Sequence, residues 1–261
     1  MDRGSPPPPA ISASWAASPR TPSCWTGSPL SSSAAAGTSD FNAAASEEDQ
    51  RNKLLWRFPR MRLEGEVIRD SALSVSGLLN EEVGGLSVFP ELPLGAGKPR
   101  GGWKVSEPTE RNRRSVYIFV RRNARYPMME AFDMPDTHES CGRRNQTTTA
   151  PQAMTLLNSK VSLEWSQAFA GRILKEAGAD PVAQIEDAFR LAYGRKPDGP
   201  EKDTVMTFLT KQQGLIADRK SAGQKLALPS SMPEGFDATR GAALVDFCQM
   251  LLNSNEFVYR N

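Results

Sequence analysis

Helical periodicity with start and stop signals fills the C-terminal part of the chain, and this pattern constrains the fold most strongly. Asp180-Pro181 is a strong helix start, and Gly194 is placed to end the same helix. Between them, apolar residues recur on one face. The same pattern predicts helices over 163–177, over 181–193, from Asp198 and Pro200 onward, and over 239–253, with a polar loop at 221–236.

The chain before residue 160 mixes helical and extended patterns. Met61 to Leu79 has apolar residues at a helical period, and a short helix is expected from Ser46. Ser115–Val120 is rich in β-branched and aromatic residues, which favours a buried strand, with 101–106 as its partner. Thr149 and Pro151 predict a helix start before 152–157. The predicted fold class is mainly α, with a small β element near residues 103–120.

The first 45 residues form a segment of different composition. Met1 to about Asp40 is dense in Pro, Ser and Ala and has almost no Val, Ile or Leu to bury. Such a segment cannot offset the entropy lost on folding, so we predict that residues 1–45 are disordered. Two interpretations stand equally: a genuine disordered tail, or a stretch outside the native reading frame. The predicted folded domain is 46–261.

Composition excludes several classes of protein. A net charge of +2 does not indicate a nucleic-acid-binding protein. The chain has no apolar run of about eighteen residues, so no membrane span is expected, and its start lacks the pattern of a signal peptide. The cysteines are Cys24, Cys141 and Cys248. A Cys141–Cys248 disulfide is open, but isolated buried thiols are the favoured interpretation.

Four potential metal ligands, Asp133, Asp136, His138 and Cys141, lie within nine residues in a loop around Pro135. Imidazole and thiolate together suit zinc. Their spacing matches no standard zinc pattern, however, and no second Cys/His pair follows at a usable distance. We therefore predict a polar loop without a metal, whose carboxylates cap backbone amides and pair with nearby arginines.

Those arginines are Arg143 and Arg144, and they make this loop the candidate site. A guanidinium matches a carboxylate with two hydrogen bonds, so an internal clamp from Asp133 or Asp136 to Arg143 is one interpretation. The other is a site for an anionic ligand, facing the amino end of the helix that starts near Pro151. The predicted binding residues are Asp133, Asp136, His138, Arg143 and Arg144.

Several motifs resemble a known family. RRSVYIFVRRN (113–123), YPMMEAFDMPD (126–136), CGRRNQTTTAPQAMTLLNS (141–159) and DFCQMLLNSNEFVYRN (246–261) are similar to a planctomycete-specific domain of unknown function that accompanies cytochrome-c-like domains. The resemblance covers about Asn52 to Asn261. It implies a large exported, extracytoplasmic protein in which this domain follows another domain and often a haem-binding module. No Cys-x-x-Cys-His occurs, so we expect no cofactor in this chain.

Two functional hypotheses follow. The first is a non-catalytic binding or scaffold module, linked to cytochrome c or polysaccharide processing. Its partner would be a preceding domain or a cytochrome-c-like module missing from this chain, which would leave apolar surface exposed near Trp56 and Phe58. The alternative is a hydrolase with its site in the 133–144 loop. A catalytic triad would have to use His138, and no Gly-x-Ser-x-Gly motif is present to supply a nucleophile.

Overall fold

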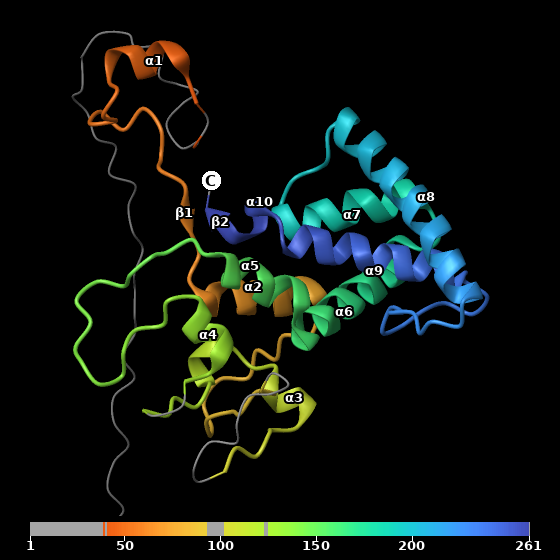
Figure 1. Cartoon of the computed structure of the whole chain (residues 1–261), viewed down its shortest axis with the longest axis horizontal. Helices are drawn as coiled ribbons and strands as arrows, with labels where there is room; N and C mark the ends of the chain where they lie inside the picture. Colours follow the sequence, from red (N-terminus) through yellow and green to blue (C-terminus); the bar gives the residue numbers. More distant parts are fainter. Residues whose placement is uncertain (1–38, 40, 93–101, 123–124, 261) are drawn as a thin grey trace, which may run out of the picture.

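Figure 1 shows the computed structural model, which describes residues 39, 41–92, 102–122 and 125–260. The predicted disordered segment therefore lies mostly outside the described residues. Within them the fold is mainly α, as predicted, with ten α-helices, one 3₁₀ helix and one two-stranded sheet. The elements are α1 (Ala43–Glu48), β1 (Met61–Arg62), α2 (Gly65–Ser76), α3 (Pro108–Arg111), η1 (Ser115–Tyr117), α4 (Pro127–Ala131), α5 (Ala150–Asn158), α6 (Lys160–Ala177), α7 (Pro181–Tyr193), α8 (Gly199–Ser221), α9 (Ala238–Leu252), α10 (Asn255–Val258) and β2 (Tyr259–Arg260).

The predicted capping signals start and end the helices where expected. The Asp180 carboxylate accepts a hydrogen bond from the Val182 amide at the start of α7, and Gly194 ends that helix with φ of 71°. Thr149 and Gln152 form a reciprocal capping box at the start of α5. These local signals explain why the helices after residue 150 agree with the sequence pattern.

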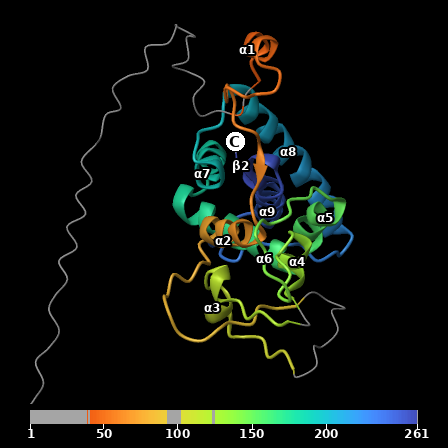
Figure 2. The same ribbon diagram turned by 90° about the vertical axis from the view of Figure 1, so that its left-hand side faces the viewer.

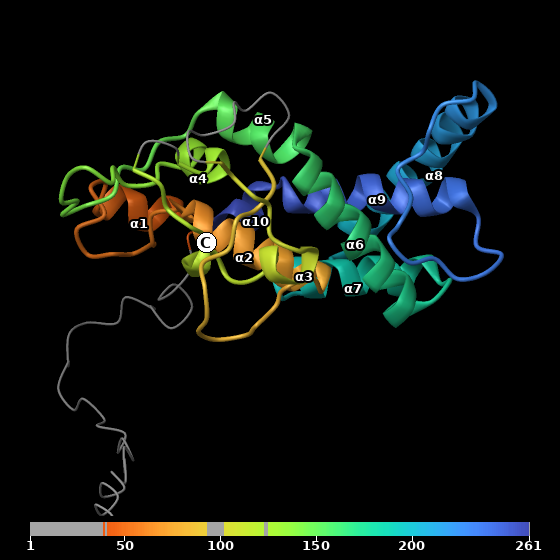
Figure 3. The same ribbon diagram turned by 90° about the horizontal axis from the view of Figure 1, so that it is seen from below.

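Helix α6 is the centre of the core. It packs against α9, α2 and α7, and Figure 3 shows it crossing the molecule beside α2 and α9. Phe169 and Ile173 of α6 are fully buried, as are Val245, Phe247 and Cys248 of α9. Cys248 and Cys141 are both free thiols, but only Cys248 is buried as predicted, whereas Cys141 is exposed and Cys24 lies outside the described residues. Burial raises the pKa of Cys248 well above its usual value.

The predicted strand over Ser115–Val120 is wrong in its first half. Ser115–Tyr117 forms the 3₁₀ helix η1, because the Asp70 carboxylate accepts hydrogen bonds from both the amide (2.7 Å) and the hydroxyl (2.6 Å) of Ser115. After η1 the chain extends, and Ile118 forms a parallel bridge with Val88. Val88 bonds residues 117 and 119, and Phe89 exchanges two hydrogen bonds with Ser106. Residues 88–89 therefore lie between the two segments that were predicted to pair directly.

The helix predicted over Met61–Leu79 begins only at Gly65. Met61 and Arg62 instead pair in antiparallel register with Arg260 and Tyr259, and this contact with a distant part of the chain overrides the local helical pattern. The sheet brings the C-terminal end of the chain beside β1 (Figures 1 and 2). Tyr259 anchors the tail as expected, together with the buried Phe257.

Helix α1 stands away from the helical body on an arm formed by residues 41–60 (Figures 1 and 2). It begins at Ala43, within the segment predicted to be disordered. Phe41 packs edge-on against Trp56 with ring centroids 5.9 Å apart. The arm exposes Phe41, Leu54, Leu55 and Phe58, each by half or more. The expected apolar surface near Phe58 is therefore uncovered in the described chain.

None of the helices that the structure describes is long and apolar enough to cross a membrane.

Candidate functional site

Asp133 of the predicted site pairs with Arg62, not with Arg143. One terminal nitrogen of Arg62 lies 2.6 Å from Asp133 Oδ2. The other donates to the Leu63 carbonyl, and Nε donates to the Thr147 carbonyl at 3.0 Å. The same Asp133 carboxylate accepts from the amide of Thr147 at 2.8 Å and from its hydroxyl at 2.9 Å. The loop between Asp133 and Thr147 is thus closed at its base, but the arginine comes from β1.

The contacts among Arg62, Asp133 and Thr147 have a structural role, since they fix the base of the loop. Arg62 is only 7 % exposed, and its guanidinium lies over the Phe132 ring. Asp133 adopts a left-handed backbone conformation with φ of 60°, which directs the chain into the loop. Partial burial raises the pKa of Asp133, but the Thr147 hydrogen bonds and the Arg62 charge outweigh it and lower that pKa below its usual value. Asp133 is therefore ionised and fully engaged at neutral pH.

The other predicted site residues do not converge on Asp133. Asp136 accepts a hydrogen bond from the His138 amide at 3.0 Å, and both side chains are exposed. Arg143 is exposed and forms no ion pair within the described residues. Arg144 instead reaches α2, where it lies 2.8 Å from Glu64 and 3.0 Å from Glu66. No group of three or more metal-ligating side chains is found in the described part of the chain.

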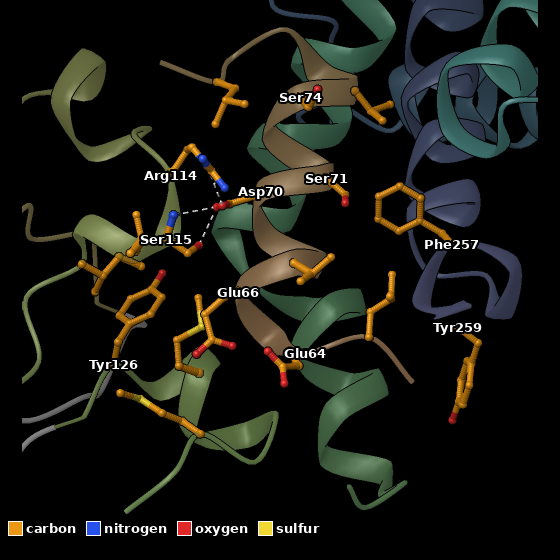
Figure 4. Close-up of a pocket in the computed structure, with 18 of the residues that line it drawn as sticks. Glu64, Glu66, Asp70, Ser71, Ser74, Arg114, Ser115, Tyr126, Phe257 and Tyr259 are labelled. Carbon is orange, nitrogen blue, oxygen red and sulfur yellow. Dashed lines mark hydrogen bonds and ion pairs between the residues drawn. The ribbon is translucent and has the colours of Figure 1, made fainter. Parts of the chain in front are cut away.

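Arg144 leads to a cleft of about 930 Å³ along the outer face of α2 (Figure 4). Figure 4 shows α2 with Arg114 and Ser115 on one side, and Phe257 and Tyr259 on the other. The floor is the face of α2 that carries Val67, Ser71, Ser74 and Val75 among others. Distant segments build the walls: residues 114–116 and 118–120, Tyr126, Met129, Met134, Arg144, Leu191, Ala192, Glu256, Phe257 and Tyr259.

Charged groups in the cleft are already paired. Asp70 accepts two hydrogen bonds from Ser115 and lies 3.9 Å from Arg114. Glu64 and Glu66 share Arg144, as given above. Glu256 lies 2.6 Å from Arg195, which stands outside the lining. Each lining carboxylate therefore has an arginine partner, and the cleft presents no free carboxylate among its described lining residues.

Apolar side chains in the cleft are unusually open to solvent. Val67 is 42 % exposed, Val116 75 % and Val120 46 %, and all three line the cleft. Phe257, Leu191 and Met134 add further apolar surface to the walls. The cleft thus combines exposed apolar side chains with carboxylates that are each paired to an arginine.

The sequence does not predict this cleft, because charged residues such as Glu66 and Asp70 on a helix are typical of a solvated face. A signal was nevertheless present. Val67 lies on the exposed side of α2, away from buried Ile68 and Ala72, whereas Val75 is buried with the core. An apolar residue on the solvent side of a helix indicates surface that the core contact does not cover.

Comparison with known proteins assigns the family. Residues 30–209 match the model of the PSD1 family, described as a protein of unknown function (DUF1553). The match covers well over half of the chain, so the chain belongs to this family. The predicted resemblance to a family of unknown function is confirmed at that level. No curated protein matches, and no solved structure matches.

Proposed function

We propose that this PSD1-family (DUF1553) chain is a non-catalytic binding module whose α2 cleft receives an amphipathic helix of another polypeptide. The observation that carries this proposal is the combination of exposed valines and mutually paired charges in the cleft. Surfaces of this composition are typical of interfaces between proteins or domains. The exposed apolar arm around Phe58 supports a second contact with the same partner.

A helix fits the dimensions and the charge of the cleft. The floor follows α2, whose twelve residues span about 18 Å, so three turns of a partner helix would cover it. Near the start of α2, Glu64 and Glu66 share one guanidinium, which leaves an excess negative charge. Further along, the Arg114 side chain is 62 % exposed. The partner helix should therefore place a basic residue at Glu64 and Glu66, an acidic residue at Arg114 and an apolar stripe between them.

We further propose, from the resemblance of residues 113–123 and 141–159 to the cytochrome-associated domain, that the helix belongs to a preceding domain or a cytochrome-c-like module of an exported protein. In this proposal the chain works outside the cytoplasm beside a haem-bearing or polysaccharide-processing partner. The motif resemblance alone supports this finer assignment.

The hydrolase alternative gains no support from the loop geometry. Both oxygens of Asp133 accept hydrogen bonds from Thr147 or Arg62, so this carboxylate is not free to accept a substrate proton. Asp136 and His138 lie exposed on the loop surface. The binding module is therefore the function that we retain.

The test uses a synthetic amphipathic helical peptide of about 14 residues. It carries a leucine stripe with lysine at one end and glutamate at the other, and a second peptide carries the same stripe with the charges exchanged. Binding is measured by fluorescence anisotropy to the wild-type chain and to Val67→Asp. Val182→Asp is the matched control, because Val182 is 46 % exposed in the first turn of α7 and lies outside the cleft.

We expect saturable binding of the first peptide in the orientation set by Glu64, Glu66 and Arg114. Val67→Asp should weaken it at least tenfold, about 1.4 kcal/mol, because a carboxylate would enter the apolar stripe. Val182→Asp should bind as wild type does. Absence of saturable binding, or equal affinity of both valine variants, would contradict the proposed docking surface.

A further inference from the structure

Two large apolar side chains of the described chain are almost fully exposed, and both lie in one loop. Val83 is 86 % exposed and Leu86 88 %, more than any other large apolar residue that the structure describes. They belong to the segment Glu81-Glu-Val-Gly-Gly-Leu86 between α2 and α3, here called the 81–86 loop. Since the core does not cover either side chain, this apolar surface is open to another molecule.

The 81–86 loop is held in a fixed conformation by a buried arginine. Arg113 is only 2 % exposed. One of its terminal nitrogens donates to the Leu86 carbonyl at 3.1 Å, and the other donates to the carbonyls of Glu82 and Gly84. The same guanidinium lies over the ring of Tyr117, whose hydroxyl accepts from the Gly84 amide at 2.9 Å. Because the loop is already ordered, a partner that binds it does not have to fix its backbone.

Negative charge accompanies the two apolar side chains. Glu81 and Glu82 are exposed, and neither forms an ion pair with a residue that the structure describes. Their carboxylates disfavour contact with an anionic lipid surface. A surface that matches the 81–86 loop must therefore be both basic and apolar.

The arm of residues 41–60 carries a pocket of that kind. This arm pocket has a volume of about 860 Å³, and its charged lining residues are Arg51, Arg57 and Arg60. No carboxylate is among its described lining residues, and none of the three arginines forms an ion pair within the described chain. The apolar part of the lining consists of Phe41, Leu55, Phe58 and Pro59. The arm pocket therefore complements the 81–86 loop in both charge and apolar surface.

The loop and the arm pocket lie at opposite ends of the described chain. Figures 1 and 2 show α1, on the arm, at one end of the molecule and α3 at the other. Asn80, which directly precedes the loop, donates to the Thr109 carbonyl of α3 at 3.1 Å, so the loop lies at the α3 end. The two surfaces therefore do not meet within one copy of the chain, but they can meet between two copies.

We propose that the 81–86 loop of one copy docks in the arm pocket of a second copy. In this contact Val83 and Leu86 meet the apolar walls, and Glu81 and Glu82 face the three arginines. Because loop and pocket are different surfaces, the contact is heterologous and leads to a chain or ring of copies, not to a symmetric dimer. A single short loop buries less than the about 1,200 Å² of a standard interface, so the association is weak and depends on concentration.

This contact goes beyond the binding of a helix in the α2 cleft and does not depend on it. No residue of the 81–86 loop lines that cleft. Leu54 is exposed and lies outside the arm pocket, so it stays accessible for a contact between the arm and the partner of the cleft.

The experiment uses the full chain and three aspartate variants at leucines that are exposed by more than half. Leu86→Asp places a carboxylate among the apolar side chains of the loop, and Leu55→Asp places one in the arm pocket. Leu215→Asp is the matched control, because Leu215 lies in α8, outside both surfaces. Sedimentation equilibrium from about 1 µM to about 1 mM gives the mean mass of each protein and of an equimolar mixture of Leu86→Asp and Leu55→Asp.

We expect the mean mass of wild type and of Leu215→Asp to rise with concentration, whereas Leu86→Asp and Leu55→Asp each stay monomeric. The mixture should form a complex of two chains and no larger species, because each pair of variants retains one intact loop and one intact pocket. Added salt should weaken the wild-type association, since charges at an exposed contact are screened.

A wild-type chain that stays monomeric over the whole range overturns the proposal. Association of Leu86→Asp or Leu55→Asp equal to that of wild type overturns it too, because the contact would then lie elsewhere. If the mixture of the two forms no complex, the loop and the pocket do not bind each other. Association that salt does not weaken contradicts the pairing of Glu81 and Glu82 with the arginines and overturns the proposed contact as well.

Discussion

At the scale of single residues, Arg62 has a larger structural role than Arg143 and Arg144, the two arginines that the sequence indicated. Its guanidinium bonds the Asp133 carboxylate and two backbone carbonyls while almost fully buried. Arg62→Ala would leave the Asp133 carboxylate without its cation, so we expect a loss of about 3 kcal/mol or more in the free energy of unfolding. Arg143→Ala, at an exposed position, should cost under about 1 kcal/mol.

Urea denaturation of the two variants measures both values. Comparable destabilisation by both would show that Arg143 has a structural role not visible in its contacts. An Arg62→Ala variant as stable as wild type would contradict the structural role of the Arg62–Asp133 pair.

Tyr126 gives a second residue-scale prediction, which concerns stability. Because its hydroxyl forms no hydrogen bond with any residue that the structure describes, Tyr126→Phe should change the free energy of unfolding by less than about 0.5 kcal/mol. Tyr193→Phe removes the hydrogen bond to Ser254 and should lower it by about 1 kcal/mol. Thermal and urea unfolding of wild type and of the two variants provides the comparison. Loss of stability in Tyr126→Phe alone would indicate a hydrogen bond that the structure lacks.

The residue scale also shows why the candidate site was only partly predictable. Proximity in sequence favoured Arg143 as the partner of Asp133, and that prediction is wrong. The actual partner, Arg62, lies 71 positions away, and no local pattern encodes such a contact. The prediction that loop carboxylates cap backbone amides is correct for Asp133, because this carboxylate accepts a hydrogen bond from the Thr147 amide just before α5.

At the scale of elements, local signals were sufficient for most helices and insufficient for strands. A capping residue, a first-turn proline or a terminal glycine acts within one turn, so the starts of α5 and α7 follow from the sequence. Strand β1 exists only because residues 259–260 pair with it. The run Ser115–Val120 has strand propensity, but two hydrogen bonds from Ser115 to the Asp70 carboxylate favour the 3₁₀ helix η1 at its start.

Close packing of α2 against α4 gives the element-scale prediction. A Cβ atom on Gly65 would lie 2.8 Å from Phe132 Cβ, and 3.3 Å from Met129 Sδ. Gly65→Ala should therefore push α2 from α4 and destabilise the fold by about 1–3 kcal/mol. Gly214→Ala is the control, since Gly214 lies in α8 with no atom within 4 Å of the added Cβ. That variant should stabilise by about 0.5–1 kcal/mol.

Denaturant unfolding of both glycine variants separates the two effects. If alanine stabilised both positions, the contact between α2 and α4 would be looser than the structure shows. If it destabilised both, the space around Gly214 would be occupied.

At the scale of the whole molecule, ion pairs tie together segments that are far apart in the chain. Arg195, between α7 and α8, lies 2.7 Å from Glu201 and 2.6 Å from Glu256. Glu91 bonds Lys160 and Arg111, and Asp133 bonds Arg62. These pairs connect β1 with the end of α4, the segment around Glu91 with α3 and α6, and the turn between α7 and α8 with α10. Because their partners are remote in sequence, neither the pairs nor their common dependence on pH follows from local patterns.

The last prediction concerns acid stability. The hydrogen bond from Arg195 lowers the pKa of Glu201 to about 2, and the pKa values of Glu91 and Asp133 are lowered as well. Each folded-state pKa lies below its unfolded value of about 4, so the folded chain binds fewer protons than the unfolded chain in this range. Their stabilising contribution is complete above about pH 5 and is lost as the pH falls toward 2.

Glu201→Gln should be less stable than wild type at pH 7, and the difference should shrink to nothing near pH 2. Glu234→Gln, at an exposed position without an ion pair in the described chain, should follow the wild-type curve. Urea unfolding between pH 7 and pH 2 measures all three proteins. A Glu201→Gln difference that stays constant over this range would show that the loss comes from packing and not from the ionised pair.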